Sequence, residues 1–546
     1  MKYSQLIKLI IKRLLLKTIV LLVTLAQPLF IKAQSRIDWQ QCYGSLEDDF
    51  GLSIVQSDNG FTILGQAESN YPSGLFGCNN YAQFRLNWLI GIDETQSIEW
   101  QNCDSIGIYQ KLHKTGDGHY YYITELGGDY YNRFNMKVRK MDREGNLLWS
   151  RYLGTNYGLG FCAEDVFGLP TSDGGIIAAT VIGEASGNVS QYFGGNDCWI
   201  VKLDAEGNLV WQTTLGTGGD ENVTCLQSAT DGGFFVWVNS EVSGYGNIGC
   251  GQQGNKGILV KLDTSGQPQW NLCFSRTSVY SMVELENGYL FAGDYRYTTD
   301  PNGNCGDGIH TYDCYLMRCD VDGNVLWEKE YGGSCNDRMV KVFQNDNGGF
   351  TIFTNSKSMD GDVKSATDLG VVGIDKGNIW IFNVDSEGTL LWERCIGSSL
   401  GLWEELRDVI RQSDKEYALV GSNTWFDGVS SGFVNCSNNE LLPNSRFNVW
   451  FLGVTDIFDY DDIPEKAQLQ NERINIIPNP TTDQFTVIGN NLRKAEILNL
   501  FGQHVLITAG EGDRITVNLR GLPAGIYFVT VTDDEGRKCV QKVVKK

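Results

Sequence analysis

A single pattern of apolar and polar positions recurs along most of the chain. An alternating apolar run ends in Asp, Gly follows three residues later in most copies, and Trp stands four residues after the Gly, as in VKLDAEGNLVW from Val201 to Trp211. Alternation with a period of two predicts strands. The Asp-x-x-Gly step predicts a tight turn in which the Asp carboxylate accepts hydrogen bonds from backbone N–H groups. Each marker occurs seven times, the Trp as Trp39, Trp100, Trp149, Trp211, Trp270, Trp327 and Trp392, and the Asp as Asp93, Asp142, Asp204, Asp263, Asp320, Asp385 and Asp456.

A hairpin turn forms a third marker in each repeat, as in SDGG at 172–175 and TDGG at 230–233. Each repeat therefore contains four short strands, which in the fourth repeat are ENVTCLQS, FFVWVN, GILVKLD and PQWNL. Self-similarity at a regular period indicates one unit stacked on copies of itself, and radial four-stranded units are propeller blades. We therefore predict an all-β chain whose residues 34–460 form a seven-bladed β-propeller, in preference to a solenoid or another blade count.

The two ends of the repeat region complement each other. The first Trp marker, Trp39, has no preceding Asp strand, and the last Asp marker, Asp456, has no following Trp. The strand near Trp39 is therefore expected to pair with strand 448–456 and to complete the blade begun near residue 404. We expect the recurring Trp side chains to pack between neighbouring blades.

The first residues have the composition of an export signal. Five basic residues between Lys2 and Lys17 precede an apolar run from Thr18 to Phe30, so we predict a signal peptide over 1–33, cleaved after Ala33. Its removal takes away six basic residues and no acidic ones, which lowers the net charge from -22 to -28. No later stretch is apolar enough to span a membrane. A field this negative repels phosphate backbones, which argues against nucleic-acid binding.

The chain changes character after a polar linker at 461–471. Residues 472–546 alternate in short strands with Pro and Gly turns, which predicts a small antiparallel β-sandwich of immunoglobulin-like type. Pro478-Asn479-Pro480, Leu500-Phe501-Gly502-Gln503, Leu522-Pro523-Ala524-Gly525-Ile526-Tyr527 and the basic end Lys542 to Lys546 occur in that order. In these motifs the segment resembles the type IX (Por) secretion C-terminal sorting domain.

This resemblance implies where the protein works. It implies handling by the type IX secretion machinery and a place outside a Gram-negative bacterium, either released or on the outer-membrane surface. The propeller repeats, with phrases such as DGGF and WIVKLDAEGNLVW, are similar to those of secreted cargo of the same route.

Loop lengths distinguish the two faces of the predicted propeller. With strands A (innermost) to D (outermost), the A–B and C–D turns are tight, whereas the B–C loops on the other face are long and aromatic. Loops on a rigid scaffold commonly carry binding, and Tyr or Trp beside Asn and Ser suits a glycan or a protein ligand. We therefore expect this long-loop face to bind such a ligand through residues that include Tyr71, Tyr81, Tyr245, Tyr295, Trp425 and Phe426.

Acidic residues at the starts of the A strands are expected near the channel mouth, where they could contact a ligand or a cation. They are Asp49, Asp165, Glu221, Asp337 and Glu405. The alternative to a binding module is a carbohydrate-active hydrolase or lyase that uses these carboxylates, since paired acids need no sequence signature. No catalytic residue is assigned.

One segment has the oxygen spacing of a calcium loop. Asp300, Asn302 and Asn304 alternate as such ligands do, although Gly306 comes one place late and no bidentate Glu follows. Calcium is the one cofactor that the sequence suggests.

The chain has 15 cysteines, and an exported protein is expected to form disulfides. Cysteines at the ends of D strands and in B–C loops fall on the same face. Assigned by blade, they predict the pairs Cys42–Cys436, Cys78–Cys103 and Cys250–Cys273, whereas Cys395 has no loop cysteine in its blade.

Overall fold

The structure is a computed structural model of the 546-residue chain. It describes residues 36–44, 49–68, 85–105, 108–125, 136–156, 166–240, 246–250, 256–275, 278–297, 311–365, 377–396, 404–413, 415–424, 447–455, 475–478, 481–498, 504–522, 525–534 and 538–546. The predicted signal peptide lies outside these residues, so it stays a prediction. The chain divides into two compact units, Met1–Ile457 and Phe458–Lys546.

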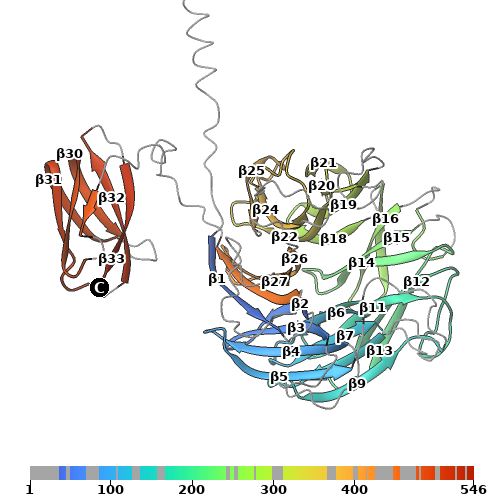
Figure 1. Cartoon of the computed structure of the whole chain (residues 1–546). Helices are drawn as coiled ribbons and strands as arrows, with labels where there is room; N and C mark the ends of the chain where they lie inside the picture. The colour runs from blue at the N-terminus through green and yellow to red at the C-terminus, as the bar shows by residue number, and fades with distance from the viewer. Residues whose placement is uncertain are drawn as a thin grey trace, which may run out of the picture. The chain divides into compact units, whose positions relative to one another are not determined.

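The first unit contains seven four-stranded antiparallel sheets, and all of its described elements are strands (Figure 1). Blades 1 to 3 follow the chain in the order A to D. They consist of β2 (Asp49–Gln56), β3 (Gly60–Glu68), β4 (Arg85–Asp93) and β5 (Ile98–Ser105); β6 (Ile108–Lys114), β7 (Tyr120–Glu125), β8 (Met136–Met141) and β9 (Leu147–Leu153); and β10 (Phe167–Pro170), β11 (Ile176–Ile182), β12 (Asp197–Leu203) and β13 (Leu209–Leu215).

Blades 4 to 6 repeat this order. They consist of β14 (Glu221–Ser228), β15 (Phe234–Ser240), β16 (Lys256–Leu262) and β17 (Pro268–Phe274); β18 (Val279–Leu285), β19 (Gly288–Tyr297), β20 (Thr311–Cys319) and β21 (Val325–Tyr331); and β22 (Asp337–Gln344), β23 (Phe350–Ser356), β24 (Asn378–Val384) and β25 (Leu390–Ile396).

Blade 7 joins the two ends of the propeller sequence. Its first three strands are β26 (Glu404–Arg411), β27 (Glu416–Thr424) and β28 (Phe447–Thr455), and its outermost strand is β1 (Arg36–Tyr43). β1 pairs antiparallel with β28 from Arg36 opposite Thr455 to Tyr43 opposite Val449. The A strands then contact one another in the closed order β2, β6, β10, β14, β18, β22, β26 and back to β2. The predicted seven-bladed propeller is confirmed.

The apolar core lies in the seams between blades rather than at one centre. Seven hydrophobic clusters are present, and each contains residues from two neighbouring blades. The seam between blades 7 and 1 unites Trp88 and Ile63 with Phe451 and Val420, which come from opposite ends of the propeller sequence. Because a sheet this small cannot bury both faces alone, each blade depends on its two neighbours.

The recurring Asp and Trp markers have the packing roles that the sequence predicts. Asp204 Oδ1 accepts the N–H groups of Glu206 (3.0 Å) and Asn208 (2.7 Å) within its turn. Trp149, on the D strand of blade 2, donates its Nε1–H to Ala205 O of the next blade at 3.0 Å. Trp327 makes the same contact with Ser386 O at 3.1 Å. The motif therefore fastens one blade to the next.

The Phe458–Lys546 unit is a small antiparallel sheet structure with its own core. It contains β29 (Asn475–Ile477), β30 (Gln484–Leu498), β31 (His504–Asn518), β32 (Gly525–Asp533) and β33 (Lys538–Lys545), and β30 pairs with both β31 and β32. Register shifts between Ile488 and Leu492 bend the long strand β30, and Asn491 adopts φ 54° there. The bend lets one strand serve both layers around Phe485, Val517 and Val529.

The cysteines follow the predicted pattern in part. Cys250 and Cys273 form a disulfide, which confirms that pair. Cys42 and Cys103 are also disulfide-bonded, but their predicted partners Cys436 and Cys78 lie outside the described residues. Cys395 is a buried free thiol.

The glycine of the Asp-x-x-Gly turn is predicted to be essential for seam packing. A Cβ on Gly266 (φ +79°) would lie 2.5 Å from Trp211, whereas one on Gly348 (φ +81°) has nothing within 4 Å. Gly348→Ala should cost only the backbone strain, about 1 kcal/mol of unfolding free energy, while Gly266→Ala should cost about 1–3 kcal/mol more. Urea unfolding of both variants measures the difference; equal losses would show that Trp211 does not constrain the turn.

Candidate functional site

The described parts of the long-loop face have a repeated anchor. Gly187, Gly246 and Gly361 each precede a residue whose N–H binds a carbonyl of the preceding blade. These bonds join Asn188 to Gly154 O (2.9 Å), Asn247 to Gly216 O (3.0 Å) and Asp362 to Gly332 O (2.9 Å). The apolar side chains that follow, Val189, Ile248 and Val363, are buried. Each of these B–C loops is thus tied across a seam at a point within the loop.

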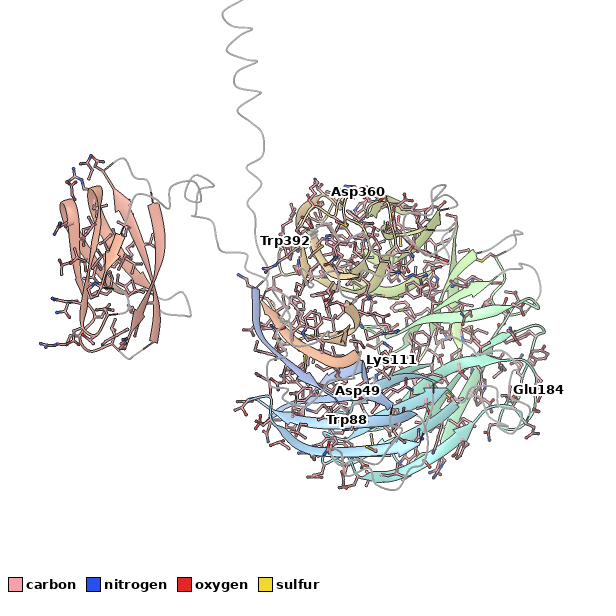
Figure 2. All side chains as sticks on the ribbon, viewed as in Figure 1. Asp49, Trp88, Lys111, Glu184, Asp360 and Trp392 are labelled. Atoms are coloured by element: carbon pink, nitrogen blue, oxygen red, sulfur yellow. A yellow bond between two sulfur atoms is a disulfide. The ribbon has the colours of Figure 1, made fainter. Side chains whose placement is uncertain are left out.

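Three of the acids that the sequence predicts at the channel mouth are buried. Asp49, Glu221 and Asp337 are at most 1% exposed, and Asp49 is labelled on its innermost strand in Figure 2. Glu405 is partly exposed and pairs with Arg407 Nη2 at 2.9 Å. The first strand residues point into the blades because the alternation of each A strand continues to its end. We therefore do not carry these acids into the functional proposal.

Glu221 and Asp337 are held by equivalent donors. Glu221 accepts hydrogen bonds from the Thr217 N–H (2.8 Å), the Thr217 hydroxyl and the Ser240 hydroxyl (2.7 Å). Asp337 accepts from the Gly333 N–H (2.8 Å) and the hydroxyls of Ser356 and Ser358, the latter at 2.7 Å. Buried carboxylates satisfied in this way are structural parts of the seam.

A second carboxyl group lies near each of these acids. Burial, with Glu221 close by, raises the pKa of Asp197 to about 6. Burial raises the pKa of Asp313 to about 7, and the negative charge of Asp337 adds to this shift. Asp313 Oδ1 is buried without a hydrogen-bond partner, and a Cβ on Gly332 would lie 2.8 Å from it and 2.6 Å from Asp337 Oδ2. Two acids so placed favour sharing a proton over ionising together.

The other predicted site residues are mostly outside the described part of the chain. This holds for Tyr71, Tyr81, Tyr245, Trp425, Phe426 and Asp165, and for the calcium-loop residues Asp300, Asn302 and Asn304. Tyr295 is described, and it packs partly buried against the cluster between blades 4 and 5. Their roles in binding stay predictions.

Two findings concern the described residues as a whole. They include no group of three or more His, Cys, Asp or Glu side chains arranged to hold a metal ion. Within the same residues, no helix has the length and apolar character needed to cross a membrane.

The A strands present equivalent residues at one level of the central channel. In six of the seven A–B pairs the register shifts by one residue, which marks a β-bulge. By strand register, the equivalent positions near this bulge, here named the channel ring, are Ser53, Lys111, Phe167, Cys225, Ser281, Lys341 and Asp408.

Several ring residues accept an N–H from the next blade. Ser53 Oγ accepts from Leu112 (3.3 Å), Ser281 Oγ from Val342 (3.3 Å), and Asp408 Oδ2 from Ile54 (3.1 Å). Asp408 Oδ2 also accepts the Ser53 hydroxyl at 2.6 Å. Lysine has no acceptor atom, so Lys111 and Lys341 do not serve this structural role.

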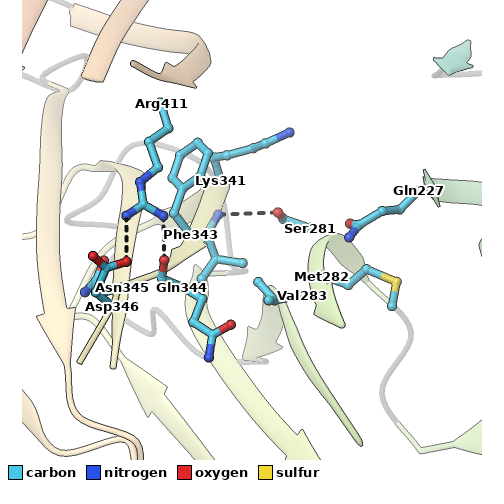
Figure 3. Close-up of a pocket in the computed structure, with 11 residues that line it drawn as sticks. Gln227, Ser281, Met282, Val283, Lys341, Phe343, Gln344, Asn345, Asp346 and Arg411 are labelled. Carbon is cyan, nitrogen blue, oxygen red and sulfur yellow. Dashed lines mark hydrogen bonds and ion pairs between the residues drawn. The ribbon is translucent and has the colours of Figure 1, made fainter. Parts of the chain in front are cut away.

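A pocket of about 640 Å³ lies against the ring (Figure 3). Its lining comes from β14, β18, β22 and β26 and from the A–B turn at Asn345 and Asp346, which places it at the tight-turn end of the channel. Arg411 is engaged there, donating to Gln344 O at 2.7 Å and lying 4.0 Å from Asp346. This pocket lies on the face opposite the long loops, on which the sequence predicts binding.

Comparison with known proteins identifies the C-terminal unit. Residues 475–546 match the family model of the secretion system C-terminal sorting domain. No curated protein matches the chain at a significant level. The protein is thus an exported propeller that carries a type IX sorting domain, and it is secreted or attached to the cell surface.

Two solved structures are similar to this chain at a low level. An α-L-arabinofuranosidase from Fusarium graminearum is 10% identical with a TM-score of 0.35, and it covers 64% of this chain and 93% of its own. An α-L-arabinanase from Penicillium chrysogenum is 11% identical with a TM-score of 0.36 and the same coverage, 64% and 93%. Likeness at this level carries no argument about activity.

The raised pKa values predict a stability that falls with rising pH. Because the folded chain keeps the proton of Asp313 up to about pH 7, while the unfolded chain loses it near its ordinary value of 3.8, folding loses free energy across that window. Wild-type Tm should therefore be higher at pH 5 than at pH 8. Asp313→Asn should reduce the difference and raise Tm at pH 8 by roughly 2–4 °C.

Asp204→Asn is the matched control for this prediction. Hydrogen bonds from Asn208 lower the pKa of Asp204, so its charge stabilises the fold at both pH values. Its loss should lower Tm about equally at pH 5 and pH 8. Thermal melts of the three proteins decide the matter, and an Asp313→Asn variant with the wild-type pH dependence would contradict the assignment.

Proposed function

We propose that this protein is a binding module, exported by the type IX route, whose long-loop face takes up a glycan or a protein ligand at or beyond the cell surface. The observation that carries the proposal is the difference between the two faces. The A–B and C–D turns are tight on one face, whereas the B–C loops on the other face are longer, and three of them are tied to the preceding blade in their described parts. Long loops held by a rigid scaffold are the arrangement that binding proteins use.

The carboxylate pairs support binding over hydrolysis. A glycosidase needs two acids facing a substrate space, about 5–10 Å apart. The pairs formed by Asp197 with Glu221 and by Asp313 with Asp337 lie in seams and are engaged by hydroxyl and backbone donors or by each other. The described channel pocket has one lining carboxylate, Asp346, which faces Arg411. The hydrolase or lyase remains the second candidate, to be separated by experiment.

Removal of the sorting domain is predicted to block export without unfolding the propeller. The two units have separate cores, so deleting residues 472–546 leaves every seam cluster intact. We expect the truncated protein to be folded and to accumulate in the periplasm, as measured by cell fractionation and circular dichroism. A full-length Lys329→Met variant, altered only on an outer strand, should be exported normally. Truncated protein outside the cell at the normal level would refute the role of this unit.

Binding through the long loops is predicted to depend on their aromatic residues. A glycan array and hydrolysis assays on the retained glycans should show retention without turnover. Trp425→Ala should weaken retention at least about tenfold, because aromatic side chains supply most of the free energy at such contacts. Tyr152→Ala is the control, since Tyr152 is 49% exposed on the outer strand of blade 2. Turnover of a retained glycan would support the enzyme instead.

A further inference from the structure

The channel pocket contains a cation that the fold itself does not use. Lys341 lines the pocket and is partly buried, and its ammonium group forms no hydrogen bond or ion pair with another described residue. In Figure 3 no dashed line reaches its ammonium group, while Arg411 beside it is bonded to Gln344 and faces Asp346. At this ring position Ser53, Ser281 and Asp408 accept an N–H group of the next blade, and a lysine side chain cannot do so. The ammonium group of Lys341 is therefore available for a ligand.

Lys111, on the same ring, adds to the positive potential of the channel. Its ammonium group also forms no hydrogen bond or ion pair within the described residues, and Figure 2 shows Lys111 at the inner edge of the blades. Burial and the charge of Lys111 lower the pKa of His113 to about 4; Asp408 opposes this shift and Lys341 adds to it, so all three charged side chains act on the same part of the channel. Asp408, the acid on this ring, is already bonded to Ser53 and Ile54. The ring thus has two lysines against one aspartate, a local excess of positive charge in a protein of net charge -22.

The pocket also contains an unused neutral donor. Asn345 is 7% exposed, and its Nδ2 group is buried without a hydrogen-bond partner, while its Oδ1 accepts the Thr351 hydroxyl at 3.0 Å. A buried amide N–H without a partner is costly unless a ligand or water meets it. Gln227 lines the opposite wall of the pocket with a second amide.

Apolar side chains complete the lining. Met282, Val283 and Phe343 lie between these polar groups. A volume of about 640 Å³ with a few polar groups over an apolar wall is typical of small-molecule sites. A bare phosphate or sulfate ion would use the cation but would leave the amides and the apolar wall without a function.

We propose that the central channel, at its tight-turn end, binds the acidic sugar unit of a glycan, with the carboxylate at Lys341, hydroxyl groups at Asn345 and Gln227, and the apolar face of the ring on Phe343. Lys111 strengthens the field that draws the anion in. This site lies on the face opposite the long loops and does not depend on the function proposed for them.

The test is isothermal titration calorimetry of the mature full-length chain at constant ionic strength, with D-glucuronate, D-glucose and inorganic sulfate as probes. Glucuronate should bind, and the other two should bind at least about tenfold more weakly, because each lacks one part of the recognised chemistry. Lack of glucuronate binding, or equal affinity for glucose or for sulfate, overturns the proposal.

Four variants locate the site. Lys341→Met keeps the side-chain length without the charge and should weaken glucuronate binding at least about tenfold, whereas Lys341→Arg should retain it. Asn345→Ala should weaken binding without changing the net charge. Lys329→Met removes an equal charge from the D strand of blade 5, where Lys329 lies over the Trp327 ring, and should bind as wild type does.

Circular dichroism melts show whether each variant is folded. If Lys341→Met is unstable, the binding retained by Lys341→Arg and lost by Asn345→Ala still tests the location of the site. Equal affinities for Lys341→Met and Lys329→Met, or full binding by Asn345→Ala, would overturn the location.

Discussion

Face-to-face packing between neighbouring blades is the interaction on which the structure depends. Among the described residues of the propeller, seven apolar clusters each join two blades, and none of them belongs to one blade alone. A set of sheets that stabilise one another only in pairs needs a closed ring, since any open end would leave an apolar face in water. β1 closes this ring by adding its strand to blade 7, and the seam that it completes contains Trp39, Phe61 and Phe451 within ring-stacking distance.

The sequence predicted this architecture because its repeats carry the seam contacts themselves. The residues of the Asp-x-x-Gly…Trp repeat themselves form the contact between blades: Trp149 donates its Nε1–H to Ala205 O of the next blade. A second repeat went unnoticed: Trp88, Trp199, Trp380 and Trp450 on the C strands each bond a D-strand Gln or Glu, such as Gln101 or Glu393. Aligning the repeats on their Asp markers places Trp88, Trp199 and Trp380 five residues earlier, so the signal was present.

The candidate sites were harder to predict, and the reasons are physical. Whether an acid at a strand start faces solvent or a seam depends on bulges and on donors such as Ser240 and Ser356, which come from another strand of the blade. The channel pocket draws on four blades spread from Gln227 to Arg411. In the sequence this pocket is indicated by lysines at a position where the other repeats have Ser, Cys, Asp or Phe. That position can be recognised only after the strands have been aligned by their register.

The C-terminal unit incorporates its basic end into its fold. Lys545 is 9% exposed, and its ammonium group donates to Leu519 O at 2.9 Å and to Leu522 O at 2.5 Å, while β33 pairs along β32. The terminal residues are therefore not a linear tag: their arrangement exists only once strands from distant parts of the unit have assembled. A secretion apparatus that reads this arrangement discriminates between folded and unfolded forms of the C-terminal unit at the moment of export.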